Sequence, residues 1–251
     1  MDARPDLSIP LAAPAALMPA RPAADDAGLT CRSLQAPLPP EGSALAPSAA
    51  LMAGASHVAR ATLDEALAKA AQTPDAVWVF GYASLIWRPE FDAVERRPAK
   101  LIGWHRALKM RSRINRGTPE LPGLVFALLN GGTCKGLAFR MSPDTWRDDL
   151  VRLWSREMPT AVYTPRWLAC RTSAGNVRAL TFTLDRLHPN HTGAIDNDAM
   201  LDILRHARGR YGTTLDYLLE TARGLREHGI HDCEIERLVK LATHAGLVHG
   251  S

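Results

Sequence analysis

The sequence predicts an α+β domain, with a mainly antiparallel sheet or small β-barrel flanked by helices. Strand-like segments gather between residues 77 and 184, and from Asp196 onward the pattern is helical. Strands that precede helices, without alternating with them, favour this class over a parallel α/β sheet. Hydrophobic residues make up 46% of the 251 and charged residues 22%, an ordinary composition that can form a core of normal size.

The first part of the chain has a different composition from the rest. Half of the 18 prolines fall within residues 1–50, interleaved with alanine and serine. Proline removes a backbone donor and breaks helices and central strands. We therefore expect residues 1–56 to form a disordered Ala/Pro-rich extension rather than part of the folded domain.

A short helix and linker is predicted for residues 57–74. Thr62 and Glu65 have the spacing of a capping box, and Pro74 stops the helical pattern. The folded domain is then expected to occupy residues 75–251.

The first strand of this domain is the run Val77-Trp78-Val79-Phe80, which ends at Gly81. β-Branched and aromatic residues in an unbroken apolar run indicate a buried strand. Asn130-Gly131-Gly132 is a strong hairpin signal, because such dipeptides supply the positive φ angles of tight turns. Further strands are predicted near residues 100–110, 123–130 and 133–140, the last two on either side of this turn.

The second half of the domain contains one helix, two strands and then three helices. Residues 144–158 show a helical pattern, with Leu150, Leu153 and Trp154 on one face. Ser173-Ala174-Gly175-Asn176 predicts a turn between two strands. The predicted strands span residues 161–171 and 177–184, and the predicted helices span 197–208, 213–228 and 232–246.

Charge and cysteine content narrow the function classes. Residues 1–75 hold 5 Lys+Arg against 8 Asp+Glu, and the rest hold 25 against 18. A basic body suits an anionic small molecule or nucleic acid, but a solubilising surface excess explains it as well. No helix-turn-helix, RRM or zinc pattern is found, so we expect no nucleic-acid partner.

The four cysteines form no CxxC pair and no metal-ligand pattern. No signal peptide and no run of 18 apolar residues is found, so we expect a cytoplasmic protein without a membrane partner. The sequence does not indicate an oligomeric state.

Three segments carry residues suited to chemistry. The first runs from Phe80 to Trp87, where a strand stops at Gly81 and enters a tight loop. Such a loop can present several backbone N–H groups in one direction and bind an anion. A plain strand-to-loop turn explains the same pattern equally well.

The second segment runs from Asn115 to Gly123 and carries Arg116 between two glycines and two prolines. A guanidinium on a rigid loop matches the two oxygens of a carboxylate. A structural loop with a solvated arginine is the alternative.

The third segment, Leu153-Trp154-Ser155-Arg156-Glu157-Met158, ends the predicted helix. Trp154, Met158 and Tyr163 could surround Glu157 with a partly apolar pocket that raises its pKa. A surface glutamate paired with an arginine is the alternative.

Taken together, these segments resemble one known family. Residues 78–87, 101–107, 116–123 and 153–158 are similar, in order, to the ChaC family, the glutathione-specific γ-glutamylcyclotransferases. Arg-Leu-His-Pro at 186–189 and Gly-Thr-Thr-Leu-Asp-Tyr-Leu at 212–218 continue the likeness. The resemblance spans residues 77–246, and it implies the γ-glutamylcyclotransferase fold.

The resemblance also implies a site and a reaction. The family's γ-glutamyl-binding loop matches Gly81 to Leu85, and its acid/base glutamate matches Glu157. The expected enzyme needs no cofactor or metal and converts glutathione to 5-oxoproline and Cys-Gly. The alternatives are a cyclotransferase for other γ-glutamyl amines or peptides, and a non-catalytic γ-glutamyl-binding protein. The candidate site comprises Glu157 as acid/base and the substrate-binding residues Gly81, Tyr82, Ala83, Ser84, Leu85, Ile86, Arg116 and Tyr163.

Two positions depart from the family pattern. Ala83 stands where the family usually has glycine, and Ala161-Val162 replaces a glycine-containing turn before Tyr163. If position 83 requires a positive φ, alanine there costs about 1 kcal/mol. Such a change would affect substrate preference more than reaction type.

Overall fold

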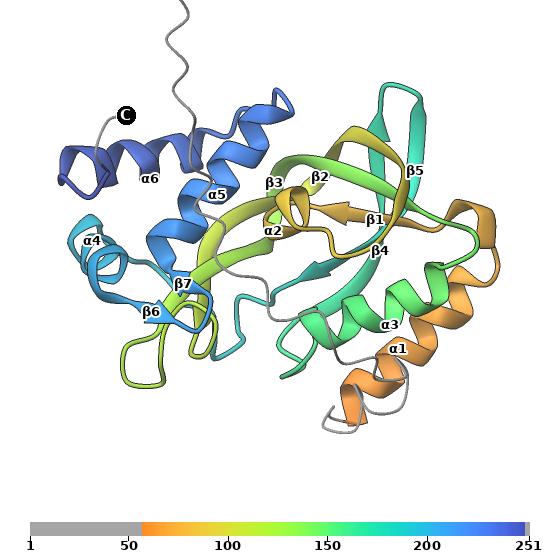
Figure 1. Cartoon of the computed structure of the whole chain (residues 1–251), viewed down its shortest axis with the longest axis horizontal. Coiled ribbons are helices and arrows are strands. Elements are labelled where there is room, and N and C mark those ends of the chain that lie inside the picture. The colour runs from red at the N-terminus through yellow and green to blue at the C-terminus, as the bar shows by residue number, and fades with distance from the viewer. Residues whose placement is uncertain (1–56, 249–251) are drawn as a thin grey trace, which may run out of the picture. The chain divides into compact units, whose positions relative to one another are not determined.

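A five-stranded barrel forms the centre of the domain (Figure 1). The computed structural model describes residues 57–248, so the extension expected at 1–56 lies outside the described residues. In barrel order the strands are β1, β3, β2, β4 and β5, and β5 returns to β1. They span Trp78–Gly81 (β1), Ala93–Ser112 (β2), Gly123–Met141 (β3), Thr164–Thr172 (β4) and Gly175–Thr183 (β5).

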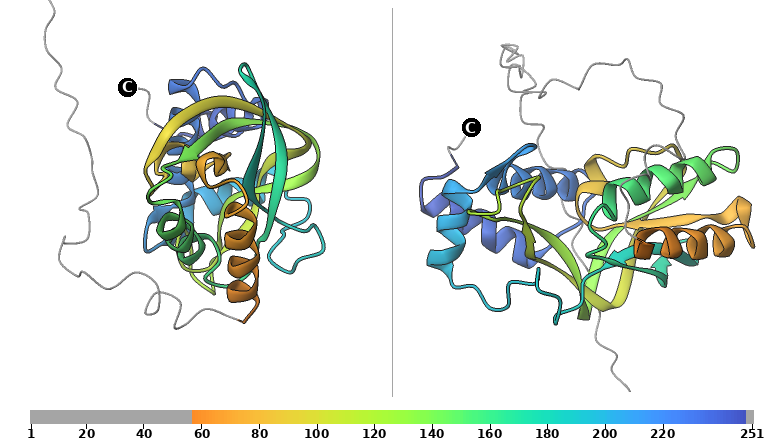
Figure 2. Two further views of the ribbon diagram at one scale, coloured as in Figure 1. Left: turned by 90° about the vertical axis from the view of Figure 1, so that its right-hand side faces the viewer. Right: turned by 90° about the horizontal axis from the view of Figure 1, so that it is seen from below.

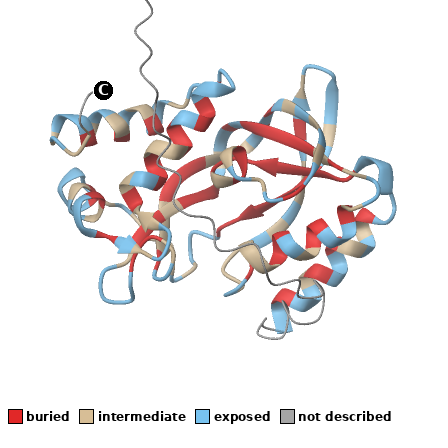
Figure 3. Cartoon of the chain, in the orientation of Figure 1, coloured by how far each residue is buried: buried red, intermediate tan, exposed pale blue. Residues whose placement is uncertain are grey.

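The pairing confirms the mainly antiparallel barrel predicted from the sequence. β1 pairs antiparallel with β3, and the pairs β2–β3, β2–β4 and β4–β5 are antiparallel as well. The closing pair, β1 with β5, is parallel, with Trp78 beside Ala179 and Val79 beside Leu180. Figure 3 shows buried residues along these strands, and Phe80, Phe126, Phe139 and Phe182 are almost fully buried in the core.

The hairpin predicted at Asn130-Gly131-Gly132 is wrong. β2 and β3 pair along nearly their whole lengths, so the turn between them is the loop 113–122. Gly131 and Gly132 do have positive φ, 97° and 74°, but they lie inside β3. There they face a register shift between Ile102 and Trp104, where a bulge bends the long ribbon. The positive φ angles of these glycines, which would allow a tight turn, instead allow β3 to bend.

The helix predicted within residues 57–74 is present, but the capping box predicted at Thr62 and Glu65 is wrong. The helix α1 spans His57–Ala70, and Thr62 lies within it. The Thr62 hydroxyl donates to the carbonyl of Val58, one turn earlier, at 2.8 Å. Such a bond back to the i−4 carbonyl is a mid-helix alternative to capping. α1 packs against the helix α3, Trp146–Glu157, at one end of the barrel (Figures 1 and 2).

The last three helices follow the predicted segments closely. They are α4 (Asn197–His206), α5 (Thr214–Glu227) and α6 (Cys233–His244). Side chains of Asp196, Thr213 and Asp232 cap their first turns. Two short strands, β6 (Arg208–Gly209) and β7 (Gly212–Thr213), form a small hairpin between α4 and α5. The helices pack together on the opposite side of the barrel from α1 and α3 (Figure 2).

The short helix α2, Ser84–Trp87, directly follows β1 and contacts α5. Trp87 Nε1 donates to the hydroxyl of Thr221 at 3.4 Å, which ties the end of α2 to α5. The end of β1, the end of α3 and the middle of α5 therefore approach one another. Among the helices of residues 57–248, none has a stretch both long and apolar enough to cross a lipid bilayer.

Candidate active site

A pocket opens where β1, α2, α3 and α5 meet. It encloses little space: the centre of a water-sized sphere fits in only about 20 Å³ of it, within about 290 Å³ that includes open solvent. Polar and aromatic side chains share the wall with backbone of the loop after β1. The lining residues are Tyr82, Ala83, Ser84, Leu85, Phe126, Glu157, Tyr163, Phe182 and Tyr217.

The loop from Gly81 to Leu85 forms one wall and depends on close packing behind it. A Cβ at Gly81 would lie 2.8 Å from Phe139 Cε2 and 3.0 Å from Leu85 Cβ, so glycine lets the loop approach the barrel. The first N–H groups of a helix lack intrahelical acceptors, and no side chain caps the start of α2. Of these, the Ile86 N–H donates to the Ala83 carbonyl at 2.9 Å, while Ser84 and Leu85 line the pocket.

The strain considered for Ala83 is absent. Ala83 has φ −144°, which any residue adopts, so alanine is tolerated there. Ala161, the second departure from the family pattern, instead has φ 50°. The free-energy cost of a left-handed backbone conformation therefore arises at Ala161, in the turn between Glu157 and Tyr163, two residues that line the pocket.

Glu157 is the last residue of α3, and its side chain is only 16% exposed. Its Oε1 lies 3.1 Å from Nε of Arg156, so the pairing with an arginine considered from the sequence exists, but inside the pocket. Burial raises the pKa of the Glu157 carboxyl, and the charge of Glu90 raises it further. The Arg156 guanidinium opposes both effects. A carboxyl with a raised pKa is suited to exchange protons near neutral pH.

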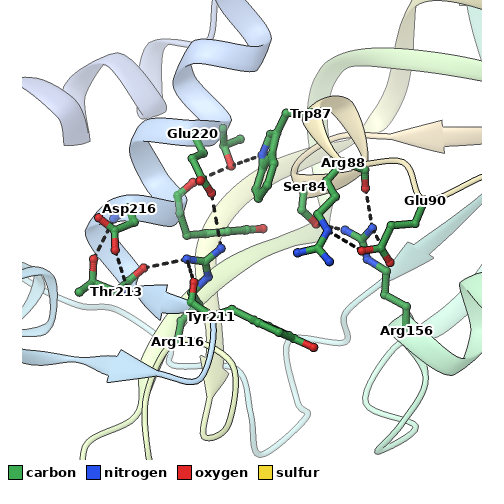
Figure 4. A network of polar contacts seen from close by, with 12 residues as sticks. Ser84, Trp87, Arg88, Glu90, Arg116, Arg156, Tyr211, Thr213, Asp216 and Glu220 are labelled. Carbon is green, nitrogen blue, oxygen red and sulfur yellow. Dashed lines mark hydrogen bonds and ion pairs between the residues drawn. The ribbon is translucent and has the colours of Figure 1, made fainter. Parts of the chain in front are cut away.

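Besides Glu157, Arg156 contacts residues of the binding loop and of α2, as Figure 4 shows. Its Nη2 donates to the Ser84 hydroxyl at 2.8 Å and its Nη1 to the Arg88 carbonyl at 2.5 Å. It also lies 3.3 Å from a carboxylate oxygen of Glu90. The end of α3 is thereby fixed to α2, which sets the position of Glu157 relative to the loop.

Three tyrosines surround the carboxylate. Burial raises the pKa of Tyr82 and Tyr163 well above 10 and that of Tyr217 to about 12, and Glu157 contributes to each shift. The Tyr82 hydroxyl donates to the Phe182 carbonyl at 3.0 Å, and that of Tyr163 to the Phe126 carbonyl at 3.4 Å. The phenols are therefore neutral at physiological pH. Because the single O–H of Tyr82 and that of Tyr163 are already donated to backbone carbonyls, these two side chains can offer a ligand only hydrogen-bond acceptors.

Three residues predicted for the site, Gly81, Ile86 and Arg116, lie outside the pocket lining. Ile86 is 5% exposed and belongs to the core. Arg116 is buried against α5, where its Nη1 donates to the Tyr211 carbonyl at 2.6 Å and its guanidinium lies 5.2 Å from the centre of the Tyr217 ring. Arg116 thus contacts the back of a lining residue. Its contact with substrate stays a prediction.

Sequence reasoning did not identify Phe126, Phe182, Tyr217 or Arg156 as part of the site. Tyr217 and Arg156 do lie in segments that carried the family resemblance, 212–218 and 153–158. Their place in these segments was the sequence feature that could have identified them as site residues. Phe126 and Phe182 are ordinary strand residues, and nothing in their local sequence distinguishes a pocket wall from a core position.

Comparison with known proteins agrees with this arrangement. A model of the family described as ChaC-like protein matches residues 77–245. The glutathione-specific gamma-glutamylcyclotransferase of Escherichia coli (strain K12) is 36% identical over 157 residues, covering 62% of this chain and 68% of that protein. The glutathione-specific gamma-glutamylcyclotransferase 1 of Homo sapiens is 28% identical over 154 residues, covering 59% and 69%.

Among solved structures, a selenomethionine-labelled gamma-glutamylcyclotransferase specific to glutathione from yeast is similar in fold. Its TM-score is 0.61 at 18% identity, and the match covers 67% of this chain and 96% of that one. At this identity the likeness establishes the fold, and it confirms the barrel architecture predicted from the sequence.

Proposed function

We propose that this chain, which belongs to the ChaC-like family, cleaves glutathione into 5-oxoproline and Cys-Gly with Glu157 as acid/base. One observation carries the proposal. A buried carboxyl with a raised pKa lies in the same pocket as the backbone of residues 82–85. The names of the relatives in Escherichia coli and Homo sapiens supply the substrate.

The substrate carries its own nucleophile. In a γ-glutamyl amide, the α-amino nitrogen attacks the γ-carbonyl carbon and closes a five-membered lactam, and the bond to the cysteine nitrogen breaks. Because the attack is intramolecular, holding the correct geometry supplies an effective molarity of about 10⁵ M or more. The pocket therefore has to fold the γ-glutamyl group into a near-attack shape and handle two protons.

Glu157 handles those protons in sequence. As a carboxylate it accepts a proton from the α-ammonium group, which frees the nitrogen lone pair. As a carboxylic acid it then donates this proton to the nitrogen of the leaving Cys-Gly amine, and the carboxylate so regenerated takes the second proton from the ring nitrogen, which leaves the neutral lactam. Glu157 can do both because its pKa is raised toward neutral pH. The contact with Arg156 keeps its carboxyl group oriented.

The loop binds the γ-glutamyl group and stabilises the developing negative charge. N–H groups at the start of α2 are suited to hold an oxyanion in a site from which water is partly excluded. The neutral phenols of Tyr82, Tyr163 and Tyr217 line the pocket without adding charge, and their oxygens can accept a hydrogen bond from the α-ammonium group. We assign Tyr163 to substrate binding on this basis.

Mass spectrometry of pure protein incubated with glutathione tests the reaction. We expect equal amounts of 5-oxoproline and Cys-Gly. N-acetylglutathione should be inert, because acetylation removes the nucleophile. Release of N-acetylglutamate and Cys-Gly from that compound would mean that water attacks, and cyclisation would be abandoned.

Two alternatives can be separated by the same assay. A cyclotransferase for other γ-glutamyl amines would release 5-oxoproline faster from those amines than from glutathione. A non-catalytic binding protein would bind glutathione in calorimetry without turnover. The buried, proton-exchanging Glu157 favours an enzyme, because binding alone does not require it.

The proposed reaction suits a reducing compartment. Cys134 and Cys170 are free and buried, and Cys233 is free and exposed. Thiols stay reduced in the cytoplasm. We therefore propose a cytoplasmic location and glutathione as the small-molecule partner.

A further inference from the structure

A buried arginine lies directly behind the binding loop. Arg106 is in the middle of β2, and its side chain is 0% exposed. Its Nη1 donates to the carbonyl of Tyr82 and, at 3.2 Å, to that of Lys135, while Nη2 donates to Oδ2 of Asp232 at 2.6 Å. Its Nε has no hydrogen-bond partner within the described part of the chain.

A charge buried this completely needs compensation, because removing an ion from water is expensive. Asp232 supplies the opposite charge, and its other oxygen accepts from the Ile235 N–H at 3.0 Å, capping α6. The guanidinium is therefore held between α6 and the barrel, and the Tyr82 carbonyl is one of the groups that this fixed cation contacts. Neither Arg106 nor Asp232 lines the pocket.

The bond from Arg106 to the Tyr82 carbonyl also affects the direction of the next N–H group, that of Ala83. In a trans peptide the C=O and the N–H point in opposite directions. A bond that draws the Tyr82 carbonyl toward Arg106, behind the loop, turns the N–H of Ala83 to the other side, where Ala83 lines the pocket. A cation on the carbonyl also polarises the amide, which strengthens its N–H as a donor.

We propose that Arg106 is a positioning residue, which holds and polarises the Tyr82–Ala83 peptide so that the Ala83 N–H binds the γ-glutamyl group. The inference rests on the proposed function for its substrate. It goes beyond that function by assigning a role to a residue that does not touch the ligand. Asp232 acts one step further back, by holding the Arg106 guanidinium in place.

Arg106→Lys tests the proposal, because lysine keeps the charge but cannot contact Tyr82, Lys135 and Asp232 at once. Arg111→Lys is the matched control. Arg111 lies on the same strand, and its Nη1 also donates to backbone carbonyls, those of Pro189 and His191, but outside the pocket lining. We expect Arg106→Lys to raise KM for glutathione at least tenfold and to lower kcat/KM about 100-fold, the size of a lost oxyanion donor. Arg111→Lys should change KM less than twofold.

A second readout does not depend on turnover. The amides of Ile86 and Arg88 donate to the carbonyls of Ala83 and Ser84, so their hydrogen exchange reports the order of the loop. In Arg106→Lys this exchange should accelerate at least tenfold, with no comparable change in Arg111→Lys. If the wild type fails to cleave glutathione, the proposed function fails, while exchange still decides whether Arg106 holds the loop.

Asp232→Asn keeps the proposal testable if Arg106→Lys does not fold. Asparagine still caps α6 but no longer neutralises Arg106. We expect a KM increase of about threefold and faster exchange at Ile86, both larger than in Arg111→Lys. A folded Arg106→Lys protein with wild-type KM and wild-type exchange at Ile86 and Arg88 would overturn the proposal. If only Asp232→Asn folds, unchanged KM and exchange in that variant would overturn it equally.

Discussion

Arg156 and Arg116 each contact residues that line the pocket, and their other partners differ (Figure 4). Arg156, at the end of α3, contacts the Ser84 hydroxyl, the Glu90 carboxylate and Glu157 itself. Arg116, in the loop between β2 and β3, contacts the carbonyl of Tyr211 and lies over the Tyr217 ring. Arg156 contacts the carboxylate of Glu157, and Arg116 lies against the ring of Tyr217, a residue of the pocket wall.

The two arginines differ because the groups that each guanidinium contacts are different. Burial lowers the pKa of Arg116, and the nearby Glu220, 3.5 Å from its Nη2, partly restores it. The Nη1 group of Arg116 also donates to the carbonyl of Thr213 at 3.4 Å, which joins the β2–β3 loop to the start of α5. Arg156 is held by groups of the binding loop and lowers the pKa of Glu157. Arg156 therefore changes the electrostatic environment of Glu157, while Arg116 holds the elements that carry Tyr217.

The largest expected effect follows from replacing the carboxylate on the Arg156 side. Glu157→Gln keeps shape and polarity but cannot exchange the proton. General acid–base catalysis contributes typically 10²–10⁴-fold, so kcat for 5-oxoproline release should fall by that factor. Circular dichroism checks folding, and calorimetry should show nearly normal glutathione binding. A folded, binding-competent variant with near-normal turnover would remove Glu157 from the mechanism.

A matched pair of lysine variants compares the two arginines directly. Lysine cannot reproduce the planar fork of either guanidinium. Arg156→Lys should lower kcat/KM at least tenfold, because Glu157 and Ser84 lose their shared donor. Arg116→Lys should leave KM within about threefold and lower Tm by several degrees, consistent with a loss of about 1 kcal/mol. A tenfold rise in KM for Arg116→Lys at unchanged Tm would instead show that Arg116 holds the substrate, as predicted from the sequence.

The pH dependence should report the environment of Glu157. The base must be ionised, and burial raises its pKa, so the acid limb of kcat/KM should have its midpoint above the ordinary glutamate value of 4.5. Glu90→Gln should move this midpoint down, because Glu90 raises the pKa of Glu157 and also competes for Arg156. An unmoved or rising midpoint in steady-state assays from pH 4 to 9 would contradict the coupling.

The same shift has a consequence for stability. Folding favours the protonated form of Glu157, so its contribution is present below the unfolded pKa and is lost as pH rises through the folded pKa. The wild type should therefore lose unfolding free energy over that interval relative to Glu157→Gln. Denaturant titrations of both proteins at several pH values measure this difference.

The smallest expected effect concerns the turn after Glu157. Ala161→Gly removes the left-handed strain at φ 50°, worth about 1 kcal/mol, but adds freedom to the unfolded chain. We expect the unfolding free energy to rise by about 0.5 kcal/mol, with kcat/KM nearly unchanged. Ala83→Gly is the control and should be destabilising or neutral, because Ala83 has an ordinary φ.

The sequence by itself determined the fold class, the order of most elements and two of the segments that line the pocket. These features have local causes. An unbroken β-branched run ending at Gly81 specifies a buried strand and a tight exit, and the periodic pattern of α3 places Glu157 at the end of a helix. The ordered motifs around them are linear in the chain, so the resemblance identified the family, and the family model confirmed it.

The conformation and the contacts that these local features adopt were set only by the tertiary structure. Gly131 and Gly132 have the positive φ of a turn, but pairing along the length of β2 turned them into a bend within β3. Ala83 and Ala161 are the same substitution in sequence, and only the backbone path shows which one is strained. Arg116 and Arg156 differ through groups about 50 to 100 residues away in the chain. Such contacts depend on packing between distant segments, which no short stretch of sequence encodes.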